Sequence, residues 1–347
     1  MLTPTEVKKL HQALTSTKDP LFFFHDDPDG LASFLLCYRY TKCGAGIPIK
    51  AKPRITTNYL NRLEEHRPDT LFVLDIAMMD QEFIDSTKTP IIWVDHHAVQ
   101  DRDGVEYLNP QTRGVNIPTP ELIWQAIGDE RPQDLWIATV GAIGDWHFPP
   151  YAQTFQQAYP QILPPTISTA EDALFTTPLG TLVKSFSFAL KGPTRNVKKT
   201  IKALTTINDP YEILEQRTKA GKHVWENYKK INKDYEALKN AALKHKPKGK
   251  LFVWTYKQDR LSLTKDLSNE LLYHFKDKVI ILGREKSGEY RCSLRAPSGV
   301  RLATALNKAL RGIEGYGGGH EQACGAAIKK EDWRRFLENL KEELKLN

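Results

Sequence analysis

Three short apolar runs in this sequence each end directly in aspartate or histidine. They are Leu21–Phe24 before His25, Leu71–Leu74 before Asp75, and Ile91–Val94 before Asp95, His96 and His97. A short apolar run that ends in polar or turn-forming residues is typical of a buried strand. Ligands of open α/β sheets bind at the carboxyl ends of the strands. The three runs therefore predict a sheet that gathers a functional site along one edge.

The first run opens the stretch LFFFHDDPDG, which carries the densest set of polar groups. If the chain stays extended past Phe24, the side chains of His25, Asp27 and Asp29 share one side. Hard divalent cations such as manganese or magnesium favour that mix of one imidazole and two carboxylates. The alternative interpretation is a polar turn in which Asp27 or Asp29 caps the next helix. The recurrence of similar groups after two further strands favours metal binding.

Helical patterns alternate with strand patterns along the N-terminal part of the chain. The predicted helices are Leu31–Lys42, Asn58–Arg67, Asp80–Ser86, Thr119–Ile127 and Gln133–Ile143. Further strands are predicted at Ile47–Ile55 and Val105–Leu108, and an irregular surface segment at Phe148–Pro165. This alternation predicts an α/β fold with a doubly wound, mainly parallel sheet.

A change of pattern divides the chain into two domains and a connector. Residues 1–190 carry the predicted parallel sheet, 191–249 are helical and strongly basic, and 250–347 form a smaller α/β domain beyond the boundary Lys246–Lys250. The basic face of the connector has two interpretations. It is a nucleic-acid track, or it is a solvated helix whose lysines pair with nearby Glu and Asp, and we favour the second.

Composition and charge place the chain among soluble globular proteins. Of its 347 residues, 40% are apolar and 26% charged, and no apolar run approaches the roughly 18 residues that span a bilayer. The N-terminus predicts a capped amphipathic helix in place of a signal peptide, so we expect a cytoplasmic protein without membrane contact. The four cysteines lack CxxC spacing, which indicates neither a zinc site nor a disulfide framework. The net charge of +7 favours polyanionic partners.

Six side chains at the ends of predicted elements are candidate ligands for a pair of metal ions. They are His25, Asp27, Asp29, Asp75, His96 and Asp145. Paired metals roughly 3.5–4 Å apart suit phosphate-ester hydrolysis because they activate water and stabilise the attacking and leaving oxygens. Asp75 follows the middle of the three runs and is therefore the natural bridging ligand. A Gly-Asp pair at a helix end, as at Asp145, is more often a helix cap than a metal ligand. Asp145 is a candidate ligand only because the other five candidates are present.

A glycine-rich run, GYGGG at Gly315–Gly319, precedes His320 in the smaller domain. It lacks the GK[ST] of a Walker loop and the GxGxxG fingerprint, and HEQAC is not the HExxH of zinc proteases. We expect a flexible loop whose backbone amides and imidazole cradle a phosphate, with a plain helix-to-strand turn as the alternative. Arg291 and Arg295 are either phosphate-binding forks or surface charges.

Together these motifs resemble the DHH phosphoesterase superfamily, specifically its RecJ-like branch with a DHH-associated C-terminal domain. The resemblance rests on HDDPDG from His25, VLD ending at Asp75, VDHH around Asp95, YLNP from Tyr107, GAIGD ending at Asp145, SLRAPSG from Ser293 and GGGH from Gly317. The spacing H-x-D-x-D-G is similar to RecJ, whereas family II pyrophosphatases more usually show H-x-x-x-D-x-D. The compact layout is similar to archaeal RecJ-like nucleases.

The resemblance implies a DHH catalytic domain at 1–190, the connector at 191–249, and a substrate-binding domain at 250–347, with an active-site cleft between the two domains. It implies two manganese ions, with magnesium or cobalt as substitutes. One ion takes His25, Asp27 and Asp75, and the other takes Asp29, Asp75, His96 and Asp145. It also implies catalytic roles for Asp75, His97 and His320, with His97 facing the scissile phosphate. The residues expected to bind the substrate phosphate are Arg295, Gly317, Gly318, Gly319 and His320.

The function implied is a manganese-dependent exonuclease acting on single-stranded DNA or RNA, with a role in DNA repair and with replication or helicase proteins as partners. One alternative is a phosphoesterase of short oligonucleotides, cyclic dinucleotides or phosphorylated nucleosides. Another is a non-catalytic RecJ-like partner of a replication helicase. Such partners usually lose metal ligands, and here all six candidates are present.

Overall fold

The computed structural model describes residues 1–347 except 51–53, 248, 258–260 and 346–347. The described chain forms two compact units, Met1–Tyr228 and Lys229–Asn347. Parts of the predicted strand Ile47–Ile55 and of the boundary Lys246–Lys250 lie outside the described residues. Among the residues that are described, no helix has the length and apolar content needed to cross a membrane.

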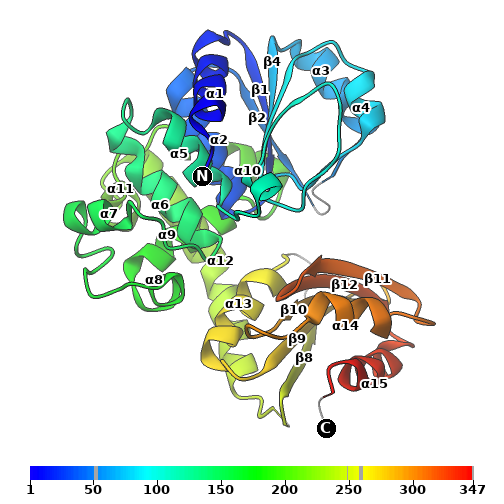
Figure 1. Ribbon diagram of the computed structural model, residues 1–347. Helices are drawn as coiled ribbons and strands as arrows, with labels where there is room; N and C mark the ends of the chain where they lie inside the picture. The colour runs from blue at the N-terminus through cyan, green and yellow to red at the C-terminus, as the bar shows by residue number, and fades with distance from the viewer. Residues whose placement is uncertain (51–53, 248, 258–260, 346–347) are drawn as a thin grey trace. The chain divides into compact units, whose positions relative to one another are not determined.

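The N-terminal unit contains a five-stranded sheet in which every pair of neighbouring strands is parallel (Figure 1). In order across the sheet the strands are β2 (Ala45–Ile49), β1 (Pro20–His25), β4 (Thr70–Leu74), β6 (Ile91–Val94) and β7 (Glu106–Leu108). A separate short parallel pair joins β3 (Arg54–Ile55) to β5 (Met78–Met79). The expected parallel sheet is confirmed, and β1, β4 and β6 are adjacent in it.

Helices cover both faces of this sheet, as a doubly wound fold requires. Phe22 and Phe24 pack with α2 (Pro28–Thr41) and α5 (Thr119–Ile127) on one face. Leu21 and Phe23 pack on the other face with α3 (Leu60–His66) and α4 (Gln81–Asp85). Strands buried on both faces read as continuous apolar runs, which explains the sequence LFFF. Each buried Phe contributes about 1.5–3 kcal/mol.

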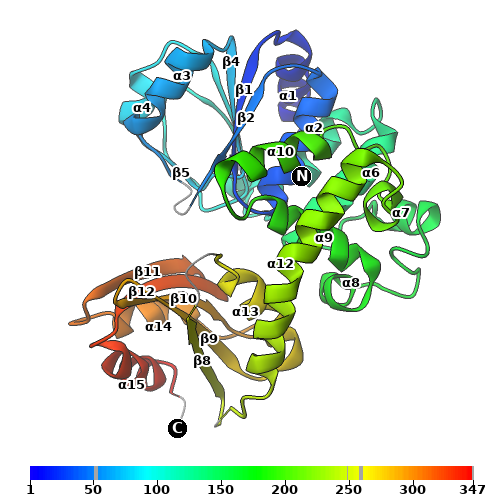
Figure 2. The same cartoon turned by 180° about the vertical axis from the view of Figure 1, so that it is seen from behind.

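The remaining helical elements of the N-terminal unit lie before, between and after these layers. They are α1 (Pro4–Ser16), η1 (Thr57–Tyr59), η2 (Pro110–Arg113), η3 (Pro132–Asp134), α6 (Leu135–Gly144), α7 (Ala152–Ala158), α8 (Ala170–Thr176), α9 (Pro178–Ala189), α10 (Thr194–Leu204) and α11 (Tyr211–Leu214). Helix α12 (Lys219–Leu243) contains the boundary between the two units (Figure 2). The prediction of an irregular surface segment at Phe148–Pro165 is wrong. It contains α7, and Phe155 and Leu163 are fully buried, because sparse apolar side chains anchor it to the core.

The C-terminal unit is a smaller α/β domain, as expected. Its strands run in the order β11 (Gly315–His320), β12 (Ala323–Lys329), β10 (Glu289–Arg295), β9 (Val279–Lys286) and β8 (Leu251–Lys257). Only β8 and β9 pair in parallel. The helices are α13 (Thr264–His274), α14 (Leu302–Ala309) and α15 (Trp333–Glu343), and a compact apolar core includes Leu294, Ile328 and Phe336.

The glycine run is a strand, so both earlier interpretations of it, a flexible loop and a helix-to-strand turn, are wrong. Residues Gly315–His320 form β11, which pairs antiparallel with β12 at the edge of the sheet. A Cβ added at Gly315 would lie 2.5 Å from the Ala327 carbonyl oxygen, and one at Gly319 would lie 2.3 Å from that of Ala323. These glycines therefore let the edge strand approach its neighbour closely.

Candidate metal centre

The HDDPDG motif combines the end of a strand with the start of a helix. Strand β1 ends at His25, and α2 begins at Pro28, where proline is favoured because its φ suits the first helical turn. Asp27 is the N-cap residue, and its Oδ1 accepts a hydrogen bond of 3.0 Å from the Gly30 amide. The expectation that the chain stays extended to Asp29 is therefore wrong, and Asp29 projects from the first turn of α2.

Close packing brings this first turn against the end of β1. A Cβ at Gly30 would lie 2.4 Å from the His25 carbonyl oxygen, so only glycine fits. Helix α6 approaches α2 in the same way, because a Cβ at Gly141 would lie 2.5 Å from the Cβ of Ala32. Asp145 is the C-cap residue of α6. Glycines therefore allow two helix termini to approach the carboxyl edge of the sheet.

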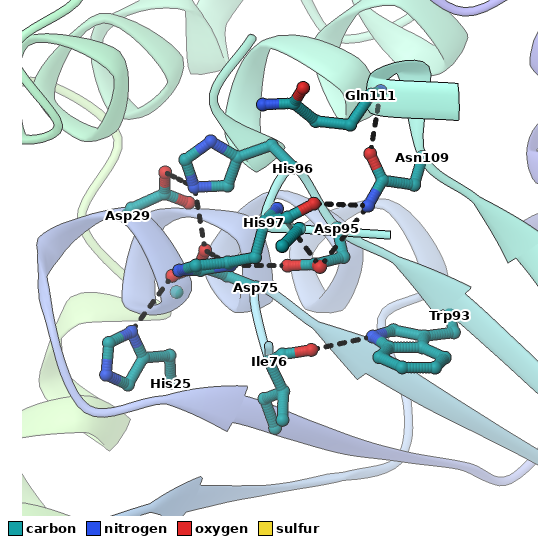
Figure 3. A network of polar contacts seen from close by, with 12 residues as sticks. His25, Asp29, Asp75, Ile76, Trp93, Asp95, His96, His97, Asn109 and Gln111 are labelled. Carbon is teal, nitrogen blue, oxygen red and sulfur yellow. Dashed lines mark hydrogen bonds and ion pairs between the residues drawn. The ribbon is translucent and has the colours of Figure 1, made fainter. Parts of the chain in front are cut away.

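Asp75 lies at the centre of the gathered side chains (Figure 3). Its Oδ2 lies 3.3 Å from His25 Nδ1, and its Oδ1 lies 3.3 Å from His96 Nε2. The side chain is 1% exposed. One buried carboxylate thus presents each of its oxygens to a different histidine.

The other candidate ligands complete two groups around Asp75. His25 Nδ1 lies 3.0 Å from Asp27 Oδ2. His96 Nε2 lies 3.8 Å from Asp29 Oδ2 and 3.8 Å from Asp145 Oδ2. The potential ligand atoms of His25, Asp27 and Asp75 lie within 4.8 Å of one another, as do those of Asp29, His96 and Asp145. The structure therefore brings all six sequence-predicted side chains together.

Excess negative charge makes this region bind protons strongly. Burial lowers the pKa of His25, but the charges of Asp27 and Asp75 outweigh burial and raise it well above the usual value. His96 behaves in the same way because Asp75 and the nearby carboxylates outweigh burial, so its pKa is also well above the usual value. Burial, followed by the charge of Asp75, raises the pKa of Asp29 well above the usual range. The negative charge that favours protonation of these groups would equally favour a cation in their place.

The backbone at Asp75 is strained. Its φ of 59° lies in the left-handed region, which a non-glycine residue adopts at a cost of about 1–3 kcal/mol. The Asp75 amide donates to the Val94 carbonyl at 3.0 Å, and the indole of Trp93 donates to the Ile76 carbonyl at 2.9 Å (Figure 3). These bonds hold the turn that ends β4 and aim the carboxylate toward both histidines.

His97 is oriented by buried partners that are not among the six candidate ligands. Its Nδ1 lies 2.7 Å from Oδ1 of Asp95, which is fully buried and also accepts a 3.1 Å bond from the His97 amide. Asn109 Nδ2 donates to the His97 carbonyl at 3.0 Å. Burial lowers the pKa of His97, but the bond to Asp95 outweighs burial and raises it. Asp75, His96 and His97 could form a third ligand group, but Asp95 already engages Nδ1 of His97.

Sequence reasoning missed three residues that orient these groups. Asp95 and Asn109 lie within the VDHH and YLNP motifs, but no role was predicted for either. Asn116 Oδ1 accepts from His96 Nδ1 at 2.9 Å and so directs Nε2 toward the carboxylates. Nothing in the local sequence distinguishes Asn116 from an ordinary loop asparagine.

Two candidate phosphate ligands of the C-terminal unit, Arg295 and His320, share one face of its sheet. Arg295 and His320 both pair with Ala323, so they lie in one row across β10, β12 and β11. The Arg295 guanidinium is buried, with Nε donating to Asn269 at 2.5 Å and Nη1 to the Leu294 carbonyl at 2.8 Å. Burial lowers its pKa to about 10. Arg291 is exposed and pairs with Glu289 at 2.8 Å.

Comparison with known proteins supports this architecture. Residues 262–346 match the DHHA1 domain family. RecJ from Thermus thermophilus, solved in complex with Mn²⁺, aligns with a TM-score of 0.70 and 16% identity over 99% of this chain and 55% of that one. The chain therefore shares the fold of RecJ, and its residues 262–346 are similar to the DHHA1 domain family.

Two other solved structures align with nearly the whole of this chain. An exonuclease RecJ bound to manganese aligns with a TM-score of 0.63 and 13% identity, covering 99% of this chain and 95% of that one. A pGpG-specific phosphodiesterase from Vibrio cholerae aligns with a TM-score of 0.54 and 14% identity, covering 94% and 99%. The chain thus spans 55% of the Thermus RecJ chain and nearly all of the other two. Among curated protein sequences, no match was found.

Proposed function

We propose that this chain is a two-metal phosphodiesterase that acts as a manganese-dependent exonuclease on single-stranded nucleic acid, with a role in DNA repair. The observation that carries the proposal is the placement of Asp75, whose two oxygens face the two ligand groups at 3.3 Å each. A bridging carboxylate between two cations needs this arrangement. The fold shared with manganese-bound RecJ structures supports the same activity.

The residues present fit a pair of divalent cations. Asp29 Oδ2 and Asp75 Oδ1 are buried and make no hydrogen bond of good geometry with a described residue, although Asp75 Oδ1 lies 3.3 Å from His96 Nε2. Buried polar atoms without partners are unfavourable, and a cation would satisfy both. Carboxylate and imidazole donors together suit manganese, with magnesium or cobalt as substitutes.

The ligand assignment follows the two groups. In the proposal, His25, Asp27 and Asp75 hold one cation, and the residues that hold the other are Asp29, Asp75, His96 and Asp145. Such a pair of cations supplies an activated water and neutralises charge on the phosphate. The first turn of α2 and the C-cap of α6 position Asp29 and Asp145 for this role.

His97 donates a proton in the proposed reaction. Asp95 holds the ring through Nδ1, so the proton that reaches the substrate comes from Nε2. Burial lowers the pKa of His97, but the bond to Asp95 raises it overall, which favours the protonated imidazole. A positioned imidazolium stabilises the negative charge that develops on a phosphate oxygen.

The substrate phosphate is assigned to the row that Arg295 and His320 share. Nη2 of Arg295 makes no hydrogen bond with a described residue, whereas Nε and Nη1 are engaged. Arg295 therefore contributes one hydrogen-bond donor and a buried positive charge, and it does not bind the phosphate in a bidentate manner. In the proposal, those amides of Gly317, Gly318 and Gly319 that do not face β12 complete the phosphate contacts.

Incubating end-labelled single strands of DNA and RNA with Mn²⁺ tests the proposal. We expect stepwise shortening from one end, and a loss of rate of about 10³-fold in Asp75→Asn, because bridging metals supply several kcal/mol of transition-state stabilisation. Asp129→Asn, a change to an exposed aspartate of the same unit, is the matched control and should cleave like the wild type. An inactive wild type, or an Asp75→Asn variant as active as the control, rejects the proposal.

A phosphoesterase of short oligonucleotides is the second candidate, because the pGpG-specific phosphodiesterase covers 94% of this chain with the same fold. A series of strands from two to twenty nucleotides separates the candidates. An exonuclease keeps or gains rate as the strand lengthens, whereas an enzyme for dinucleotides loses it.

A further inference from the structure

Helix α10 carries a cationic surface that no acidic residue of its own balances. Between residues 173 and 208 the sequence contains six Lys or Arg and no Asp or Glu. Four of these cations are exposed on α10 itself, namely Arg195, Lys198, Lys199 and Lys202. Across the described part of the chain, none of these four makes an ion pair. The charge of Lys198 contributes to lowering the pKa of Glu65 on α3, after the larger effect of Arg62. The ion-pair partner of Glu65 is Arg62, at 2.7 Å.

The expectation that the basic connector pairs its lysines with nearby acids is therefore wrong for α10, although it holds elsewhere in the connector. On α12, Lys239 Nζ lies 2.8 Å from Glu236 and 3.1 Å from Glu270. The paired lysine has carboxylates one turn away and on a neighbouring helix, whereas no carboxylate occurs in the sequence of α10. The unpaired charge of α10 needs a separate explanation.

The charge arrangement of α10 is unfavourable for the helix alone. Arg195, Lys198, Lys199 and Lys202 are spaced three or four residues apart, where like charges repel. The first turn holds a cation and no acidic residue, and the N-cap Pro193 makes no side-chain bond, which opposes the helix dipole. The helix forms because Val197, Ile201 and Leu204 are buried in the core of the unit.

Specific bonds hold the outward face in place. The Arg39 guanidinium donates to the Thr205 and Ile207 carbonyls just past the helix end, at 3.0 and 2.8 Å. Thr200 Oγ1 lies 3.2 Å from His223 Nε2 on α12. Figure 2 shows α10 on the outside of the N-terminal unit. The cations are thus presented on a fixed scaffold, which limits the ordering entropy that a ligand must overcome.

We propose that Arg195, Lys198, Lys199 and Lys202 form a docking surface for the sugar-phosphate backbone of a single-stranded nucleic acid. Side chains one helical turn apart present a regular row of positive charge, which suits the regular negative charge of a phosphate backbone. The apolar residues of α10 are committed to the core, so the helix has no apolar side chain to insert into a lipid surface. Charge complementarity therefore selects nucleic acid.

The inference rests on the proposed function and names its substrate class more closely. A strand held on α10 gains affinity from nucleotides that do not react, so a long strand binds more tightly than a short one. Chemistry at the metal centre is unchanged, because no residue of the docking surface is a candidate ligand. The docking surface therefore predicts a preference for strands of many nucleotides over dinucleotides.

Anisotropy of fluorescein-labelled dT4 and dT20, measured on the full chain in EDTA over a range of salt concentrations, tests the surface. In the triple variant Lys198→Gln, Lys199→Gln, Lys202→Gln, we expect dT20 affinity to fall roughly tenfold or more. The slope of log K against log salt should decrease by about 2, at about 0.7 for each lost phosphate contact. Affinity for dT4 and hydrolysis of a dinucleotide with Mn²⁺ should stay unchanged.

The matched control removes three charges elsewhere in the same unit. Lys8, Lys18 and Lys88 are exposed and make no ion pair with a described residue, and their triple change to Gln should leave dT20 affinity near that of the wild type. Equal losses in both triple variants would show a general charge effect and overturn the docking surface, as would an α10 variant that binds like the wild type. Wild-type binding to phosphatidylserine vesicles but not to dT20 would also overturn it.

The two proposals fail separately. A wild type that binds dT20 through α10 but cleaves no phosphodiester refutes the nuclease assignment and keeps the docking surface. Cleavage of long strands at an unchanged rate by the α10 variant, with unchanged affinity, refutes only the docking surface.

Discussion

The two sheets of the protein prepare their functional edges in opposite ways. The carboxyl edge of the N-terminal sheet concentrates titratable side chains around Asp75, which is 1% exposed. The edge strand β11 of the C-terminal sheet is almost free of side chains, because four of its six residues are glycine. One edge supplies charge through side chains and the other exposes backbone. A site can thus be built either from reactive side chains or by leaving side chains out so that the backbone is accessible.

The two edges also destabilise the fold for different reasons. At the N-terminal edge, carboxylates are buried close together and Asp75 has a φ of 59°. The buried charges are unfavourable until a cation or a proton neutralises them, and the left-handed φ adds backbone strain. At the C-terminal edge the unfavourable term is the conformational entropy of glycine. Ligands should therefore stabilise the first edge strongly and the second weakly.

Removing the charge of Asp75 should weaken metal binding more than any other single change. Asparagine tolerates left-handed φ, so Asp75→Asn preserves the turn while it removes the shared carboxylate. We expect the number of tightly bound Mn²⁺ ions, measured by titration calorimetry, to fall from two to one or none. Burial and the charge of Asp27 raise the pKa of Asp75, but its contacts with His25 and His96 outweigh both and lower it. The thermal midpoint of the metal-free variant should therefore fall, because the ionised carboxylate stabilises the folded state. A variant that still binds two ions tightly would contradict the bridging role.

The second prediction concerns pH. In the metal-free protein the pKa values of His25, His96 and Asp29 are all raised, so the folded state binds more protons than the unfolded state. Each group contributes stability that is fully present below its unfolded pKa and is lost as pH rises through its folded pKa, by up to about 1.4 kcal/mol per group and pH unit. Metal binding has the opposite dependence, because protons leave both histidines when they become ligands.

Thermal unfolding between pH 6 and 9, with and without Mn²⁺, measures this divergence. We expect the midpoint of the metal-free protein to fall with rising pH and the stabilisation by Mn²⁺ to grow. Asp75→Asn should flatten both trends, whereas Asp129→Asn should preserve them. A stabilisation by Mn²⁺ that is constant across this range would show that the two histidines do not bind the metal.

An intermediate effect is expected at Asn116, which holds Nδ1 of His96 at 2.9 Å. Asn116→Ala should weaken Mn²⁺ binding about 10–100-fold, because partners that orient a ligating histidine typically contribute that much. Asn116→Asp keeps the acceptor oxygen and should restore most of the affinity. Asn61→Ala, at an exposed position on α3, is the control. Unchanged metal affinity in Asn116→Ala would remove Asn116 from the site.

The sequence predicts an edge of a sheet well where residue type determines its structure, and poorly where tertiary packing does. The parallel sheet and the six gathered side chains follow from apolar runs that end in Asp or His. The position of Asp29 was expected for the wrong reason, because Pro28 starts a helix where an extended chain was assumed. Asn116 was missed because its partner lies twenty residues away. No local pattern encodes such a long-range contact.

The C-terminal edge was harder to predict because glycine has no side chain to show a periodic pattern. The alternation that marks a strand is absent from GYGGGH, so a loop was expected where β11 forms. The pairing becomes visible only from β12, whose carbonyls approach Gly315 and Gly319. For α10 the sequence showed the charge, but the absence of partners depends on the fold.

Two neighbouring glycines of β11 should differ in their tolerance of a methyl group. A Cβ at Gly319 would lie 2.3 Å from the Ala323 carbonyl oxygen, and its φ is 147°, so Gly319→Ala should destabilise the C-terminal unit by about 1–3 kcal/mol. A Cβ at Gly318 would meet no described atom within 4 Å, so Gly318→Ala should leave the thermal midpoint unchanged.

If a phosphate approaches this backbone, the methyl group added in Gly318→Ala should raise KM about tenfold with little change in kcat, because it obstructs binding and leaves the metal centre intact. Thermal unfolding and steady-state kinetics of both variants decide the matter. A Gly318→Ala enzyme with wild-type KM would show that β11 is free of side chains only to pack against β12, and the phosphate contacts assigned to its amides would then be wrong.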